Sequence, residues 1–293
     1  MTPRESEIIE LLHKEVKPAL GCTEPIAVAL AAARTMETLK SKAKTVADYE
    51  ISVEVSGNIL KNGMGVGIPG TGMVGLHIAA ALGAVCGNSS YGLEVLKDLT
   101  DEDVNSAKAL VKDGKVKIKV ADSPKILYVK VTVNTPEHNA WTVIEDDHDR
   151  IVETGIDGSV SDFRKGGSGK SSPVKGALDY NLTVEEIYSF ALGAAFEDIR
   201  FILEDRDLNL ALATEGLKGK YGLEVGKSIR ENQQEVFGDD FLSFAMGLTA
   251  AASDARLAGC KRPGMSNSGS GNHGITASTP VREKALKYDV DDE

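Results

Sequence analysis

The spacing of apolar residues predicts two helices at the start of the chain. Apolar side chains recur every fourth residue between positions 4 and 20, as on one face of an amphipathic helix: Ile8, Leu12, Val16 and Leu20. Gly21 then lies where a left-handed residue commonly ends a helix. Pro25 fits the first turn of a second helix, which we predict to run to about Lys40. Residues 22–24 therefore form a tight helix–helix junction.

Between residues 48 and 157 the apolar period changes from four to two, which is typical of half-buried strands. Five segments show this alternation: 49–55, 116–120, 128–133, 140–145 and, more weakly, 151–154. Helical segments over 73–85 and 101–112 separate the first two strands. This pattern predicts an α+β domain that contains an antiparallel sheet.

Helical patterning returns after a segment rich in glycine and serine, residues 158–176, which we predict to be a loop or linker. Thr183 and Glu186 have the spacing of a capping box that opens a helix. Further helices are predicted over 199–217, 222–236 and 240–258. The predicted fold class is therefore α+β: a mainly helical core of residues 1–47 and 158–293, with an α+β domain of residues 48–157 inserted.

The composition limits the classes of partner. The chain has 293 residues, with 33 Lys+Arg against 44 Asp+Glu and a net charge of −11, which argues against nucleic acid or an anionic membrane surface as partners. Three cysteines rule out a disulfide scaffold and fit a reducing compartment. The longest apolar run, residues 26–33, is too short to span a membrane. We expect a cytoplasmic protein, and a homo-oligomer is left open.

Two glycine-rich segments resemble nucleotide-binding motifs without the required context. Residues 65–70 and 70–75 match G-x-G-x-x-G, but no strand comes directly before them. We interpret them as tight turns with close backbone packing, or, at Gly70–Gly72, as the wall of a pocket for a small anion. Residues 166–171 resemble a P-loop, but Arg164 stands where that motif needs glycine, which favours a flexible linker. We predict no nucleotide cofactor.

A third segment, residues 266–274, combines glycine with serine, asparagine and histidine. Glycine lets successive backbone N–H groups converge on an anion, and the polar side chains add hydrogen-bond donors. This composition favours a carboxylate-binding or catalytic loop. A solvated connecting loop is the alternative.

Cys22 lies just before the second predicted helix, where the helix dipole favours a thiolate suited to nucleophilic attack or metal ligation. The alternative is a small residue that fills a tight turn. Cys86 is expected to be a packing residue, and Cys260 allows either interpretation. No C-x-x-C spacing is present, which excludes a zinc ribbon or a thioredoxin-like site. His138 and His148 are expected on the surface of the sheet, unless they face one another from adjacent strands.

Taken together, several motifs resemble the L-cysteine desulfidase family, which is related to the alpha chain of iron–sulfur L-serine dehydratases. The resemblance covers essentially the whole chain. It rests on five segments: Gly21–Pro25, Pro69–Gly72, His138 to His148, Tyr221–Gly226 and Met265–Gly274.

The resemblance implies a lyase without pyridoxal phosphate that uses a [4Fe-4S] cluster as Lewis acid to cleave L-cysteine to pyruvate, ammonia and sulfide. Cys22 matches the family's first cluster ligand. The family's other cluster cysteines lie beyond the segment that matches residues 266–274, so the remaining ligands are expected beyond residue 293. A truncated chain of this kind is expected to hold no stable cluster and to have little activity alone.

Beside this resemblance, we infer roles for individual residues from their chemistry and position. His273 and Ser268 are assigned to catalysis, with His273 as the base or proton relay. The residues assigned to substrate binding are Thr23, Glu24, Thr71, Ser266, Asn267, Ser270 and Asn272. If these assignments hold, Cys22 and His273 should line one cavity.

Two other functions fit the same residues. An L-serine dehydratase would use the same cluster chemistry with hydroxide as the leaving group. A non-catalytic protein that binds an amino acid or a small anion would keep the loop and lack the cluster. Both remain alternatives to L-cysteine desulfidase.

Overall fold

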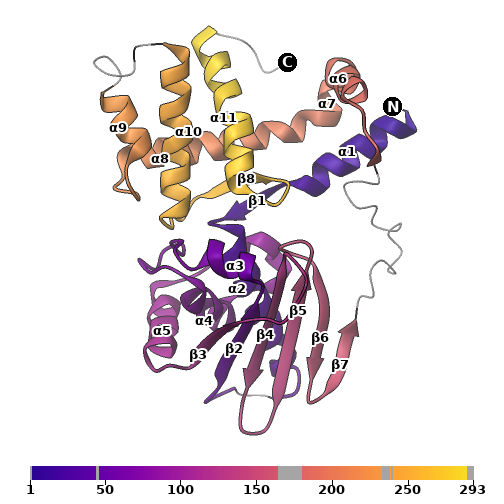
Figure 1. The fold of residues 1–293 in the computed structure, drawn as a ribbon, viewed down its shortest axis with the longest axis vertical. Helices are drawn as coiled ribbons and strands as arrows, with labels where there is room; N and C mark the ends of the chain where they lie inside the picture. The colour runs from indigo at the N-terminus through magenta and orange to yellow at the C-terminus, as the bar shows by residue number, and fades with distance from the viewer. Residues whose placement is uncertain (1, 44–45, 164–179, 233–237, 239, 289–293) are drawn as a thin grey trace.

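The computed structural model describes residues 2–43, 46–163, 180–232, 238 and 240–288. Figure 1 shows a lower part built around a sheet and an upper part built mainly of helices, with the N-terminal helix in the upper part. The fold is α+β, as predicted.

The lower part contains a six-stranded sheet with the order β3-β2-β4-β5-β6-β7. Its strands are β2 (Glu50–Val55), β3 (Val116–Val120), β4 (Tyr128–Asn134), β5 (Asn139–Glu145), β6 (Ile151–Ile156) and β7 (Ser159–Phe163). Neighbouring strands are antiparallel except β2 and β3, which are parallel. The predicted sheet is therefore confirmed, with one parallel pair added.

Strand β7 lies in the segment that we predicted to be a linker, so that prediction is wrong for residues 159–163. Asp157 and Gly158 both have positive φ, 52° and 77°, as in the two-residue turns that favour Asp-Gly and match the twist of a hairpin. The turn therefore sends the chain back along β6 as a sixth strand.

The lower part of the molecule also contains the helices that cover the sheet. They are α2 (Thr23–Lys40), α3 (Gly57–Gly63), α4 (Leu76–Cys86) and α5 (Asp101–Lys112), with a 3-10 helix η1 (Ser89–Glu94). Helix α2 packs on β4, β5 and β6 and against α4, and its alanine-rich faces are buried. The division of the chain into domains at residues 47 and 158 stays a prediction. Helix α2, which precedes residue 47, packs on the sheet.

The predicted helix over residues 4–20 ends early. Helix α1 (Pro3–Glu15) is followed by strand β1 (Val16–Leu20), which pairs with β8 (Pro263–Asn267) in a two-stranded antiparallel sheet. Pro18 explains the change, because proline inside a helix removes a hydrogen bond and clashes with the preceding turn. Apolar residues thus still recur every fourth position beyond the end of α1, although residues 16–20 form a strand.

The upper part consists of the C-terminal helices. They are α6 (Val184–Gly193), α7 (Phe196–Ile199), α8 (Leu203–Lys218), α9 (Val225–Glu231), α10 (Phe241–Leu257) and α11 (Gly271–Tyr288), with a 3-10 helix η3 (Arg200–Ile202). The capping box at Thr183 is present, as predicted. Leu212, Leu248 and Ile275 belong to a second buried cluster, separate from the core around α2 and the sheet.

The glycine-rich segment 65–72 packs against the connection between α10 and β8. The Gly67 N–H donates to the Leu257 carbonyl at 2.8 Å, and a Cβ at Gly67 would lie 2.4 Å from the Ala258 carbonyl carbon. This confirms close backbone packing and joins the two parts of the molecule. The P-loop-like residues 166–171 lie outside the described residues.

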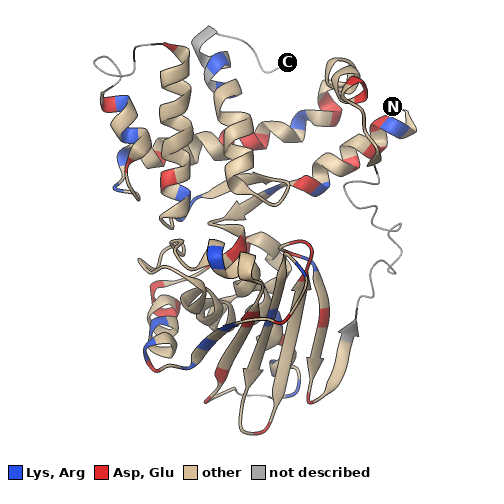
Figure 2. Cartoon of the chain, viewed as in Figure 1, with Lys and Arg blue, Asp and Glu red and all other residues tan. Residues whose placement is uncertain are grey.

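Acidic and basic residues are interspersed along the chain in both parts (Figure 2). Among the helices that the structure describes, none combines the length and the apolar character needed to cross a membrane.

Asp205 in α8 is buried, and its burial raises the pKa of the carboxyl from 3.8 to about 6. The folded protein therefore holds a proton that the unfolded chain has lost, so stability falls as pH rises from about 4 to about 6. Asp205→Asn keeps an acceptor for Asn209 Nδ2 and removes this charge. We expect the variant to gain about 2 kcal/mol over wild type at pH 8 and nothing below pH 4.

Urea unfolding at pH 4, 6 and 8 measures this difference. The matched control is Asp207→Asn, since a hydrogen bond from Arg206 lowers the pKa of that exposed carboxyl. An Asp205→Asn variant that is no more stable than wild type at pH 8 would contradict the assignment.

Candidate active site

Pairing of β1 with β8 brings the Cys22 junction and residues 266–274 together. Gly21 has a φ of +80° and turns the chain at the end of β1, so that α2 starts beside the segment that follows β8. The buried Thr23 hydroxyl donates to the Gly269 carbonyl at 2.9 Å. Two segments about 250 positions apart in the sequence therefore share one hydrogen-bonded contact.

Glu24 is the centre of the hydrogen bonds at this junction. Its Oε2 accepts from Cys22 Sγ at 2.8 Å and from Thr23 Oγ1 at 3.3 Å, and its Oε1 accepts from Asn62 Nδ2 at 3.2 Å. Burial acts to raise the pKa of Glu24, but the hydrogen bonds from Cys22, a backbone N–H and Asn62, together with the charge that His148 carries when it is protonated at acidic pH, outweigh it and lower the pKa below its ordinary value. Glu24 is therefore a half-buried carboxylate at neutral pH.

Cys22 is a buried thiol, and not the thiolate that the sequence led us to expect. It forms the N-cap of α2 without a side-chain capping bond, and its S–H donates to Glu24. Burial raises the pKa of Cys22 to about 11, although the charge of Arg256 acts in the opposite direction. Desolvation of the sulfur outweighs the helix dipole, whose effect is about 0.3–1 kcal/mol.

This protonation state predicts slow, strongly pH-dependent alkylation of Cys22. We expect the rate of iodoacetamide labelling, followed by peptide mass spectrometry, to rise up to about pH 11 with no plateau near pH 8. A cysteine in a short unstructured peptide is the control. Labelling of Cys22 that levels off below pH 8 would show a thiolate instead.

Arg256 is a site residue that the sequence did not identify. It lies in the last turn of α10, is 4% exposed, and donates from Nη1 to Asn272 Oδ1 at 3.1 Å. A Cβ at Gly271 would lie 2.2 Å from Arg256 Nε, so glycine at this position leaves room for the guanidinium. Arginine near a helix C-terminus is ordinarily explained by its favourable interaction with the helix dipole. The sequence therefore gave no reason to assign Arg256 to the site.

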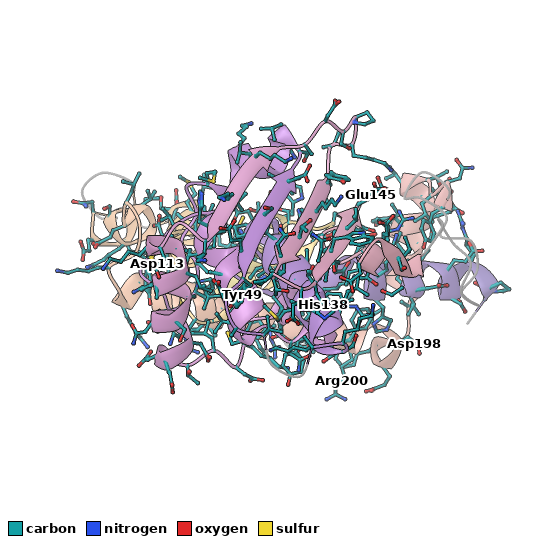
Figure 3. All side chains as sticks on the ribbon, turned by 90° about the horizontal axis from the view of Figure 1, so that it is seen from below. Tyr49, Asp113, His138, Glu145, Asp198 and Arg200 are labelled. Atoms are coloured by element: carbon teal, nitrogen blue, oxygen red, sulfur yellow. The ribbon has the colours of Figure 1, made fainter. Side chains whose placement is uncertain are left out.

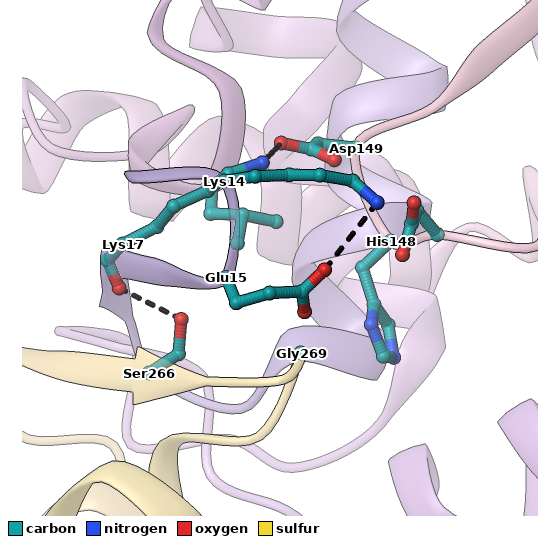
Figure 4. A pocket seen from close by; sticks show the side chains of 9 residues that line it. Lys14, Glu15, Lys17, His148, Asp149, Ser266 and Gly269 are labelled. Atoms are coloured by element: carbon teal, nitrogen blue, oxygen red, sulfur yellow. Dashed lines mark hydrogen bonds and ion pairs between the residues drawn. The ribbon is translucent and has the colours of Figure 1, made fainter. Parts of the chain in front are cut away.

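His148 is the imidazole beside the junction. It lies in the turn between β5 and β6, borders two pockets, and points toward Gly269, whose Cβ would lie 3.2 Å from His148 Nδ1 (Figure 4). The pocket in Figure 4 is also lined by Lys14, Lys17 and Ser266. Burial lowers the pKa of His148, which favours a neutral ring at pH 7.

The two histidines of the strand region do not face one another. His138, labelled in Figure 3, lies in the turn at the opposite end of β5. Its Nδ1 lies 3.0 Å from Asp157 Oδ2. The seven residues of β5 separate the turns by roughly 20 Å. Only His148 therefore belongs to the candidate site.

His273 and Cys22 are not among the lining residues of the two pockets beside His148. His273 is exposed, and its backbone N–H donates to Ser270 Oγ at 3.4 Å. That the two residues line one cavity stays a prediction. Asn272 turns toward Arg256, and the next helical residue points about 100° away from it.

Several side chains assigned to substrate binding, and Ser268, which is assigned to catalysis, form hydrogen bonds within the chain. Ser266 donates to the Lys17 carbonyl at 2.7 Å, and Ser268, at a φ of +50°, donates to Asn267 Oδ1 at 3.0 Å. The buried Thr71 hydroxyl donates to the Ile68 carbonyl at 2.8 Å and stabilises the glycine-rich turn. The structure thus brings Cys22, Thr23, Glu24 and residues 266–272 together and leaves Thr71 within its own turn.

The described residues do not fit an iron–sulfur cluster. Such a cluster needs about three protein thiolates, and no group of three potential metal ligands occurs in the part of the chain that the structure describes. Cys86 donates to the Leu82 carbonyl in α4, and Cys260 belongs to the buried cluster of the upper part. Among the cysteines of the described residues, Cys22 is therefore the one that lies at the candidate site.

Comparison with known proteins identifies relatives of the chain. Residues 90–292 match the profile of the family described as "Serine dehydratase alpha chain". Proteins described as "UPF0597 protein" from Oleidesulfovibrio alaskensis and Shewanella pealeana are 47% and 46% identical over 100% and 93% of this chain. The chain spans 67% and 63% of their lengths. No solved structure matches the chain significantly.

Proposed function

Because the chain belongs to the serine dehydratase alpha chain family, we propose that it forms the amino-acid site of a lyase that eliminates the β-substituent of a small α-amino acid. L-cysteine is the first candidate substrate, giving pyruvate, ammonia and sulfide. L-serine, with water as the product in place of sulfide, is the second.

One observation supports this proposal above the others: the hydrogen bond between Thr23 and Gly269. It holds a carboxylate, Glu24, and a thiol, Cys22, beside the glycine-rich segment and the imidazole of His148. The half-buried carboxylate suits the ammonium group of an amino acid, and a neutral imidazole suits proton transfer.

The elimination divides into steps that such groups serve. A base takes the α-proton, the Cβ–S or Cβ–O bond breaks, and the leaving group departs as sulfide or water with a proton. The enamine that remains hydrolyses to pyruvate and ammonia. We propose His148 as the base because it borders both pockets, whereas the catalytic roles of His273 and Ser268 stay predictions from sequence.

The family is generally iron–sulfur dependent. In such enzymes the cluster would act on the leaving group. Cys22 alone does not fit a cluster, so no step of the proposal passes through one.

The test is turnover by the purified chain, which is treated anaerobically with iron and sulfide, desalted to remove free sulfide, and then incubated with L-cysteine or L-serine. We expect pyruvate and ammonia in equal amounts, with matching sulfide from L-cysteine, at a low rate that falls at least about 100-fold in His148→Gln. His138→Gln, at the far end of β5, is the matched control.

Two other results would decide against the lyase. Thermal stabilisation by either amino acid without any pyruvate would favour a non-catalytic amino-acid-binding protein. Neither stabilisation nor product would contradict an amino-acid site of either kind.

A further inference from the structure

A buried arginine without an acidic partner lies beside the candidate site. The Arg256 side chain has one hydrogen bond, to Asn272, and no carboxylate oxygen within 4.0 Å among the described residues. The guanidinium offers only N–H donors and no acceptor, so its natural partner is an anion or another acceptor. A buried charge without a counter-ion is costly, so an anion is the expected partner of this guanidinium.

The surroundings of Arg256 add positive potential. The guanidinium lies against Gly271, the first residue of α11, where the helix has unpaired N–H groups and the positive end of its dipole. Helix α2 also begins nearby, at Thr23, which is hydrogen-bonded to Gly269. Glu24 lies in the first turn of α2, whereas the first turn of α11, beside Arg256, contains no acidic residue.

Arg256 adjoins the junction through residues 269–272. The guanidinium lies against Gly271 and donates to Asn272, while the Gly269 carbonyl accepts from Thr23. In keeping with this, the charge of Arg256 acts on both Cys22 and His148. Glu24, the carboxylate of the junction, is hydrogen-bonded to Cys22, Thr23 and Asn62 and forms no ion pair with Arg256. The site thus has one positive and one negative group that are not paired with each other.

We propose that Arg256 binds the α-carboxylate of the amino acid, an inference that rests on the proposed function. A guanidinium presents parallel N–H donors that match the two oxygens of a carboxylate. Glu24 offers the opposite charge to the ammonium group, so the pair suits a free zwitterionic α-amino acid and disfavours amines that lack the carboxylate. Asn272 is then a positioning residue, because it holds Nη1 of the guanidinium.

A comparison of L-serine with ethanolamine, which is serine without its carboxylate, tests this assignment by calorimetry. We expect wild type to bind L-serine at least about 30-fold more tightly than ethanolamine. The Arg256→Gln variant should bind L-serine and ethanolamine with similar affinity, because only L-serine has a carboxylate that loses its contact with the guanidinium. Arg262→Gln, an exposed arginine near Glu215, is the matched control and should keep the wild-type ratio.

Two further variants keep the test decisive if Arg256→Gln does not fold. Arg256→Lys keeps the charge and loses the paired donors, and Asn272→Ala releases the guanidinium. We expect each to lower the preference for L-serine about threefold to tenfold while ethanolamine binding is unchanged. A purely structural role would leave this ratio intact.

The outcomes separate this inference from the proposed function. Wild-type preference for L-serine that persists in Arg256→Gln, or in both Arg256→Lys and Asn272→Ala, would overturn the role of Arg256 alone. Absence of binding of either L-serine or L-cysteine to the wild-type chain would overturn the amino-acid site and this inference with it.

Discussion

Replacing Glu24 with glutamine is expected to weaken binding of L-cysteine and L-serine at least about 30-fold. Two effects combine. The substrate ammonium loses its negatively charged partner, and a glutamine amide must turn its NH2 group toward either Cys22 and Thr23 or Asn62, all of which donate to Glu24. Titration calorimetry measures the change.

The matched control for this variant is Glu102→Gln, an exposed glutamate in α5. It should bind both amino acids as wild type does. Affinities for Glu24→Gln within about threefold of wild type would mean that the Glu24 carboxylate does not contact the substrate.

Replacing Gly83 with alanine is expected to destabilise the protein by more than about 3 kcal/mol or to prevent folding. Gly83 lies where α4 crosses α2, and its Cβ would be 2.1 Å from the Ala29 carbonyl oxygen. The obstacle is backbone, so no rotamer change relieves it and the two helices must separate. The higher helix propensity of alanine, about 1 kcal/mol, offsets only part of this.

Urea unfolding compares Gly83→Ala with Gly193→Ala in α6, where an added Cβ meets nothing within 4 Å. The control should be as stable as wild type or up to about 1 kcal/mol more stable. Equal stability of Gly83→Ala and wild type would contradict the close packing of α2 and α4.

The sequence patterns correctly predicted those helices and strands that are specified by residues close together in the chain. Thr183 and Glu186 specified the start of α6. The alternation of strands 49–55, 128–133 and 140–145 specified the centre of the sheet.

The errors arose where a distant partner decides the structure. Residues 16–20 keep a helical spacing, but their pairing with 263–267 makes them a strand. The Cys22 thiolate was predicted from the helix start alone, whereas its burial depends on the segments that fold over it. The helix dipole is a local effect, and desolvation is a tertiary one.

The candidate site could be predicted only in part for the same reason. The polar composition of residues 266–274 and the position of Cys22 singled out both segments. Arg256 and His148 lie at a helix end and in a strand turn, where charged and polar residues are common, and only the fold brings them to the junction. His273 was chosen for its residue type, but its side chain is exposed.

Hydrogen exchange followed by mass spectrometry, with and without saturating L-serine, tests most directly whether the two segments form one amino-acid site. We predict slower exchange in three segments together: residues 20–26, 146–150 and 264–275. The glycine-rich residues 65–75 and the far end of the sheet around residues 134–139 should exchange as before. Slower exchange in only one of the three segments, or no change in any of them, would contradict a single shared site.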